Sequence, residues 1–357
     1  MKRLDYYIIG KFLGTFFLSI VLILSIAVVF DLTEKLDDFY EHQVPAREII
    51  FDYYINFVPY YLDMFSQLFI FISVIFFTSK MAGNSEIIAI LAAGVSYERF
   101  LRPYMLTATF LFAFTFGLGG WVIPKASQKM LAFTDKYIEK FTRESARNVQ
   151  MVVSEGTVLY IESYQNRTRV GYRSSLEHFE GKRLMQRITA DRIRHIDGYT
   201  WRLENYTKRD FDGMRESLVQ GQALDTTIAV LPEELFITAE QAPQMSNNEL
   251  YAYIQKQRER GAGNTRAFET EWYSRFAGPL GAFIMTLLGV TLSSKKVRGG
   301  MGKNLGIGVA LTAAYILFST VSTTFSVSGV MSPFMSVWLP NFIFLAIALV
   351  LYLRVRR

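Results

Sequence analysis

The stretch FLGTFFLSIVLILSIAVVF, residues 12–30, carries no formal charge and decides the class of this chain. The hydrocarbon core of a bilayer is about 30 Å thick, so an α-helix needs roughly 20 apolar residues to cross it. Three more apolar stretches of similar length follow Glu271, whereas nothing between Lys125 and Glu271 is long and apolar enough to span. We therefore expect a membrane protein with a polar insert.

The composition supports this class. Hydrophobic residues make up 51% and aromatic residues 15% of the chain, which argues against a wholly soluble protein. The absence of cysteine excludes disulfides, thiolate metal sites and cysteine nucleophiles. Three scattered histidines, His42, His178 and His195, cannot form an HExxH zinc site. Asp31 and Glu34 follow the first apolar run where a signal peptide would be cleaved, so we expect a retained helix.

The charges of the loops predict the orientation of the spans. We expect six spans, at residues 10–31, 53–79, 103–123, 272–293, 304–326 and 336–353. Short cytoplasmic loops are rich in lysine and arginine. The loop 294–303 carries four cations and no acid, whereas residues 31–52 carry seven acids. Alternating the spans places both termini and residues 80–102 in the cytoplasm, and residues 124–270 outside.

The expected fold is an α-helical membrane protein with an inserted, all-β, jelly-roll-like periplasmic domain. Residues 1–123 would hold the first three spans, 124–270 the outer domain and 271–357 the last three spans. Within the outer domain we expect β structure at 145–240, with strand-like runs at 157–164, 200–206 and 226–231. The turn pairs that separate such runs are Glu180-Gly181, Asp197-Gly198 and Asp212-Gly213. Ser246 and Glu249 form a capping box that begins a helix over 246–260.

A glycine-rich run, Gly299-Gly-Met-Gly-Lys-Asn304, resembles part of a phosphate-binding loop. Such a loop needs a leading glycine, where this chain has Val297, and a hydroxyl after the lysine, where it has Asn304. We therefore expect a basic turn there and no nucleotide site.

A short, mostly apolar helix is expected at residues 84–94, between the second and third spans. It begins near Asn84 or Ser85, has Glu86 close to its start and ends at Gly94. Its apolar side must be buried, either against the spans of this chain or against a cytoplasmic partner.

Polar side chains lie within two of the spans. In the second span Asn56, Asp63 and Gln67 share a face with Tyr60, and they either line a cavity or form hydrogen bonds between helices. In the fifth span small hydroxyl residues are typical of close helix packing; they are Ser319, Ser322, Thr323 and Ser326.

A basic stripe follows the third span. Its members, spaced to share one helix face, are Lys125, Lys129, Lys136, Lys140 and Arg143. Asp135 and Glu139 are interleaved with them, so the stripe is either an ordinary solvated face or a surface for anionic head groups above the membrane.

Five motifs, in their order along the chain, resemble the lipopolysaccharide-export permease family, whose paired F-type and G-type subunits form the membrane part of an ABC transporter. They are Leu4-Asp-Tyr-Tyr-Ile-Ile-Gly-Lys11, Ser85-Glu86, Ala93-Gly-Val-Ser96, Trp121-Val-Ile-Pro124 and Glu271-Trp-Tyr-Ser-Arg-Phe-Ala-Gly-Pro-Leu280. With the order of spans and insert, the resemblance covers essentially the whole chain. The first motif is closer to the G-type subunit. The G-type pattern places a lysine near the outer end of span one, where this chain has Asp31, with Lys35 one turn later.

The resemblance implies a multi-pass permease of the bacterial inner membrane that takes lipopolysaccharide from that membrane and passes it to a periplasmic jelly-roll bridge protein. It implies two more partners, a cytoplasmic ABC ATPase dimer and a second permease of the family, and no nucleic acid. The ATPase would use ATP, and this chain would bind no cofactor or metal and catalyse no reaction. The coupling role of the family's short helix maps onto Ser85, Glu86 and Gly94. The candidate substrate-binding residues are Asp31, Lys35 and Asp63, together with the basic stripe.

Two other functions remain open at this point. A permease for lipoproteins or peptides would also use a docking helix and an outer domain, although such permeases more often have four spans. A membrane-anchored sensor or scaffold with a ligand-binding β domain would need neither six spans nor the short apolar helix. An intramembrane hydrolase is disfavoured, because no serine–histidine or paired-aspartate arrangement stands out in the spans.

Overall fold

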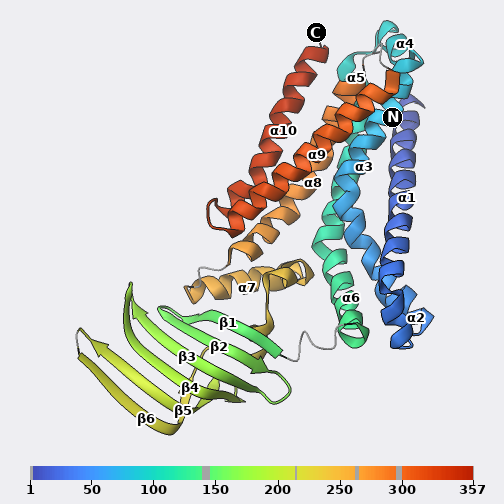
Figure 1. Cartoon of the computed structure of the whole chain (residues 1–357). Helices are drawn as coiled ribbons and strands as arrows, with labels where there is room; N and C mark the ends of the chain where they lie inside the picture. Colours follow the sequence, from blue (N-terminus) through green and yellow to red (C-terminus); the bar gives the residue numbers. More distant parts are fainter. Residues whose placement is uncertain (1–2, 139–144, 214, 262–264, 295–299, 357) are drawn as a thin grey trace. The chain divides into compact units, whose positions relative to one another are not determined.

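The computed structural model describes residues 3–138, 145–213, 215–261, 265–294 and 300–356. The chain divides into two compact units. The helical unit comprises Met1–Met130 and Glu269–Arg357, and the β unit comprises Leu131–Phe268. Figure 1 labels the helices and strands of both units.

Long helices make up the helical unit. In the first half of the chain they are α1 (Arg3–Glu41), the short α2 (Ala46–Glu48), the π-helical turn η1 (Ile49–Tyr54), α3 (Ile55–Gly83), α4 (Glu86–Ala92), α5 (Tyr97–Gly117), the π-helical turn η2 (Leu118–Val122) and α6 (Ile123–Tyr137). In the second half they are α8 (Arg266–Ser293), α9 (Gly300–Val327) and α10 (Pro333–Arg356). Because α9 begins at Gly300, the end of the expected loop 294–303 is helical; residues 295–299 lie outside the described residues.

Six helical stretches of the described chain are long and apolar enough to cross a membrane. They are Arg3–Glu41, Ala46–Gly83, Tyr97–Tyr137, Arg266–Ser293, Asn304–Val327 and Pro333–Val355. All six expected spans lie within them, and the insert falls between the third and fourth. The acidic segment 31–52 between the first two expected spans is partly helical, because α1 continues to Glu41. Its charged last turns stay helical with the help of an ion pair four residues apart, from Lys35 to Asp31.

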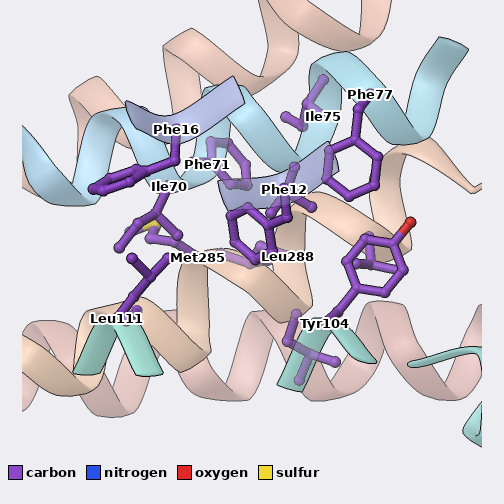
Figure 2. Packing of buried hydrophobic residues seen from close by; sticks show 14 of the residues in the cluster. Phe12, Phe16, Ile70, Phe71, Ile75, Phe77, Tyr104, Leu111, Met285 and Leu288 are labelled. Atoms are coloured by element: carbon purple, nitrogen blue, oxygen red, sulfur yellow. The ribbon is translucent and has the colours of Figure 1, made fainter. Parts of the chain in front are cut away.

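The core of the helical unit is apolar and aromatic. Residues at every fourth position of α1 are buried there: Ile8, Phe12, Phe16, Ile20 and Leu24. Figure 2 shows Phe12 among Phe71, Phe77, Tyr104 and Leu288, which come from α3, α5 and α8. The Phe77 and Tyr104 rings stack at a centroid distance of 5.3 Å. Since lipid tails are as apolar as these side chains, close packing rather than the hydrophobic effect holds the helices together.

The β unit contains one antiparallel sheet. Its strands are β1 (Ser145–Ser154), β2 (Thr157–Gln165), β3 (Val170–Glu180), β4 (Arg183–Asp197), β5 (Thr200–Asp212) and β6 (Arg215–Thr227). They pair in sequence order, so β1 and β6 are the two edges. The expected all-β antiparallel insert is confirmed. Within the described strands the connectivity is a meander, without the crossovers of a jelly roll, because each strand turns directly into the next.

The predicted turn pairs are confirmed, with Gly181, Gly198 and Gly213 at φ of 63°, 52° and 64°. A left-handed residue is needed in such tight hairpins, and glycine adopts it without strain. The strand predicted at 226–231 was wrong, because β6 ends at Thr227. The segment that follows turns back over the sheet, where its buried Val230 carbonyl accepts a hydrogen bond of 3.0 Å from Trp201 Nε1.

Three helical segments follow the sheet: the 3-10 turns η3 (Pro232–Phe236) and η4 (Ala239–Gln244), and α7 (Asn247–Glu259). The capping box of α7 is confirmed. The Ser246 amide donates to Glu249 Oε2 at 2.8 Å, and the Glu249 amide donates to Ser246 Oγ at 3.3 Å.

A single line of bends crosses the sheet. Regular pairing is interrupted on every strand in one row, formed by Asn148, Glu162, Arg173, Asp191, Asn205 and Gln222. On alternate strands the row residue is left-handed, with φ of 53° at Asn148, 50° at Arg173 and 51° at Asn205. Local irregularities of this kind bend a strand. Because they are in register, the whole sheet curves, as Figure 1 shows.

Candidate functional site

The short helix α4 is positioned by turns at both of its ends. Ser85, at its N-cap, and Gly94, just after it, have left-handed φ of 62° and 83°. The Glu86 carboxylate accepts hydrogen bonds from Asn84 Nδ2 at 3.1 Å and from the Tyr7 hydroxyl at 3.4 Å. Ser85, Glu86 and Gly94 therefore set the start and end of one compact feature between α3 and α5.

Among the residues that the structure describes, those packed against α4 cover one of its sides. Ile87 is 1% exposed, and the partly buried Ile90 packs against the same core. On the other side Ile88 is 54% and Leu91 is 37% exposed. The apolar side of this helix was expected to be buried either against the spans or against a partner. Among the described residues, the spans bury Ile87, partly bury Ile90 and leave Ile88 and Leu91 exposed.

Asp31 and Lys35 lie together at the far end of α1. Lys35 Nζ is 3.0 Å from Asp31 Oδ1, and the Tyr53 hydroxyl donates to the same oxygen at 3.1 Å. Lys35 also donates to the Tyr53 hydroxyl, and its Nζ lies 4.6 Å from the Tyr53 ring centroid. The charge of Lys35 is thus compensated within the chain, and sequence reasoning missed Tyr53 as the residue that closes the cluster.

The polar face of α3 divides into two parts. Asn56 donates to the Phe51 and Asp52 carbonyls at 3.0 and 2.9 Å, at the π-helical turn η1. Gln67 donates to the Gly278 carbonyl of α8 at 2.8 Å, which is a bond between helices. Gly281 makes room for this amide, because a Cβ there would collide with it.

Asp63 lies between Asn56 and Gln67 on the same face. Within the part of the chain that the structure describes, its carboxylate forms no hydrogen bond or ion pair, and the acidic side chain that acts on it electrostatically is Glu271. Glu271 itself accepts a hydrogen bond of 3.0 Å from Arg275 Nε. Asp63 therefore remains a candidate for a polar cavity contact.

The hydroxyl stripe of α9 packs against other helices. Ser326 forms a hydrogen bond of 2.8 Å with Thr270, and Ser322 donates to the Ser336 carbonyl at 2.6 Å.

The described part of the basic stripe is exposed. Lys125 and Lys129 have no ion pair with any residue that the structure describes. Lys136 is also exposed, with its Nζ 4.4 Å from the Tyr137 ring centroid. Lys140 and Arg143 lie outside the described residues.

Many cations of the sheet are paired across its strands. The pairs, with their closest N–O distances, are Arg173 to Glu162 (2.6 Å), Arg187 to Glu177 (2.8 Å), Arg194 to Glu204 (3.4 Å), Arg202 to Asp225 (2.7 Å) and Arg209 to Glu216 (3.4 Å). The hydrogen bond between Arg202 and Asp225 raises the pKa of the arginine and lowers the pKa of the aspartate. Among the described residues no three histidine, aspartate or glutamate side chains gather as metal ligands.

Six helical stretches able to span a membrane, a sheet domain inserted between the third and fourth, and a short half-exposed helix between the second and third define a multi-pass membrane protein with an inserted β domain. Residues 6–354 match the lipopolysaccharide export system permease LptF/LptG family, and the chain belongs to this family. It is a transmembrane permease subunit of lipopolysaccharide export, coupled to a separate ATPase. The match covers the F-type and G-type members together. No curated protein matches the chain.

Proposed function

We propose that this permease takes lipopolysaccharide out of the bacterial inner membrane and passes it to a periplasmic bridge protein. A cytoplasmic ATPase dimer uses ATP and drives α4, and a second permease of the family completes the membrane path. The chain itself needs no cofactor. The observation that carries the proposal is the half-covered α4, whose open side presents Ile88 and Leu91 beside Glu86.

The open side of α4 has the chemistry of a docking surface. Burying the exposed part of Ile88 and Leu91 under a partner would contribute about 1 kcal/mol for each side chain. Glu86, in the first turn, favours the helix through its dipole and offers a carboxylate to a basic residue of the ATPase. The apolar contact would supply affinity, and the Glu86 carboxylate would fix how α4 is aligned on the ATPase surface.

The orientation that we propose places α4, both termini and the loop after α8 in the cytoplasm, and residues 124–270 in the periplasm. The support is the excess of lysine and arginine in the segments placed in the cytoplasm. In Figure 1 both termini and α4 lie at the same end of the helical unit, as this topology requires.

The edge of the sheet that fits the bridge protein is β6. All eight residues in its centre, 217–224, are uncharged, and Leu218 and Val219 are each about half exposed. Long, uncharged edge strands are avoided by proteins that do not pair through them. The opposite edge lies beside other elements of the β unit: residues 148–152 of β1 line a cavity of about 530 Å³, whose other walls include Val158, residues 234–239, α7 and Phe268.

The docking role of α4 is tested with Glu86→Lys. We expect the purified variant to lose its ATPase, because the reversed charge repels the basic partner, while its β unit stays folded. Glu98→Lys, at an exposed position in the first turn of α5, is the matched control and should retain the ATPase. Unchanged complex stability and export in Glu86→Lys would refute the proposed docking surface.

The bridge contact is tested separately by photo-crosslinking. A photoreactive residue at Val219 on β6 should link to the bridge protein, and one at Val149 on β1 should not. Equal yields from the two edges would contradict the assignment of β6.

A further inference from the structure

The segment from α4 to the start of α5 is attached to α1 on both sides. At its beginning, Glu86 accepts the hydrogen bond from the Tyr7 hydroxyl. At its end, Arg99 binds Asp5. Tyr7 and Asp5 are two residues apart and point to nearly opposite sides of the helix, so the first turns of α1 lie between the two attachment points.

The contact between Asp5 and Arg99 is the stronger of the two. It is bidentate, with Nη1 2.8 Å from Oδ1 and Nη2 2.8 Å from Oδ2. Asp5 is 3% exposed, whereas the Arg99 side chain is 29% exposed, so the carboxylate is buried and the two parallel hydrogen bonds fix its geometry. The residues are 94 positions apart in the sequence, so the pair joins two elements that are distant along the chain.

Apolar packing continues the attachment toward the membrane. Ile8 of α1, Ile87 of α4 and Phe100 of α5 belong to one buried cluster. One turn further, Phe12 lies 6.5 Å from Tyr104 between ring centroids. The ion pair therefore lies at the end of a continuous packed interface and is not an isolated surface contact.

The other end of α1 is held in a similar way. Past Leu24 the next buried residue of α1 is Phe39, and between them the Asp31–Lys35 pair is fixed to Tyr53. A helix of 39 residues rises about 58 Å at 1.5 Å per residue. One rigid element thus joins the surroundings of α4 to the cluster at the far end of the helical unit.

We propose that Asp5 and Arg99 are positioning residues that transmit the movement of α4 to α1, so that ATP use in the partner displaces α1 along its whole length. This inference rests on the proposed docking of the ATPase at α4. It assigns a transmission role to an ion pair that joins α1 to α5.

The test uses Asp5→Cys with Arg99→Cys, in a chain that has no cysteine of its own and with cysteine-free partners. The double variant is reconstituted with its ATPase and second permease in proteoliposomes, before and after joining the two thiols with a short bis-maleimide. We expect the unlinked complex to hydrolyse ATP normally but to release about tenfold less lipopolysaccharide per ATP, the scale of a typical coupling between sites. Linking should restore the yield, because it rebuilds the connection without the charges.

Three comparisons keep the result specific. Each single cysteine treated with the linker should show no recovery. Glu177→Gln, which breaks the partly exposed pair with Arg187 in the sheet, should leave the yield per ATP unchanged. If the cysteine variant does not accumulate, Asp5→Arg with Arg99→Asp should export like the wild type, and Asp5→Arg alone should not.

A wild-type yield from the unlinked variant, or no recovery after linking, would overturn the inference. Loss of the ATPase from the unlinked complex would overturn it too, because the pair would then only hold α4 for docking. Glu86→Lys separates the two proposals: if that variant keeps its ATPase and exports normally, docking at α4 is wrong whatever Asp5 does.

Discussion

Removing one guanidinium from the β unit should loosen the segment that follows the sheet. Arg260, just after α7, lies in a buried cluster around Glu234 of η3. Its Nη1 is 2.6 Å from Glu234 Oε2, and it also donates to the Ala229 carbonyl. Lys256 Nζ lies 2.9 Å from the other carboxylate oxygen. We expect Arg260→Met to release these connections.

The magnitude follows from the burial of the pair. Both side chains are less than a tenth exposed, and breaking such a pair by removing one partner costs about 3–5 kcal/mol. Lys256 remains as a partial partner, so we expect a loss of about 2–3 kcal/mol. That loss corresponds to an opening equilibrium about 30- to 150-fold more favourable.

Hydrogen exchange of the full-length protein in nanodiscs measures this directly. Peptides that cover residues 228–239 and α7 should exchange faster by that factor, because local opening controls their protection. The double variant Arg260→Met with Glu234→Leu should lose less than the single variant, because it gives up hydrogen bonds at the Leu231 amide and the Ala229 carbonyl but leaves no buried carboxylate without its arginine. Less than about a fivefold increase in the single variant, or equal losses in both, would refute the reasoning.

The same cluster gives this segment a pH dependence. Burial alone would raise the pKa of Glu234, but hydrogen bonds from Arg260, Lys256 and the Leu231 amide outweigh it, and the pKa is lowered. An unfolded glutamate titrates near about 4.3. The stabilisation is therefore complete above that pH and is lost as pH falls through the lower folded value. After correction for intrinsic rates, exchange in the wild type should rise over that range more than in Arg260→Met.

Three further predictions concern charge, topology and the bend line. Reversing Lys125, Lys129 and Lys136 to glutamate should leave assembly with the ATPase intact but reduce crosslinking to anionic glycolipid; the control reverses three exposed cations of the β unit, Arg167, Lys182 and Arg183. Equal losses would mean that only net charge matters. In intact cells, an impermeant thiol reagent should label a cysteine at position 198 and not one at 298; the opposite pattern contradicts the topology. Asn205→Val should destabilise the sheet by about 1–2 kcal/mol, because a β-branched residue is strained at positive φ; an unchanged melting temperature would contradict that.

The sequence predicts the spans well because long apolar runs have few other uses. It predicts their ends less well, since residues after Phe30 are charged and yet helical. In the sheet, the Gly-containing hairpin turns are visible, and β2 and β5 carry enough apolar residues to read as strands. β6 is polar and exposed, so its pattern does not distinguish it from a loop.

The bend line could not be read from the sequence. A glycine in the sequence indicates a possible left-handed backbone position, whereas Asn148, Arg173 and Asn205 are typical polar residues of a strand. These residues form a row only once the pairing register of the six strands is known. The contacts of the candidate sites also depend on residues far apart in the sequence. Asp31 and Lys35 are neighbours on one helix, but Tyr53, which joins them, comes from η1, and Arg99 of α5 binds Asp5 of α1.

The pairing of Asp31 and Lys35 bears on where an anionic head group would bind. A phosphate that approached Lys35 would compete with a carboxylate already 3.0 Å from its ammonium group, and would itself be repelled by that carboxylate. Lys125 and Lys129 meet no such competition among the described residues. Lysines four residues apart offer mobile point charges without one fixed geometry, which suits a substrate that must move past them. We therefore propose that the lysines of α6 recognise the head group and that the Asp31–Lys35 pair of α1 does not.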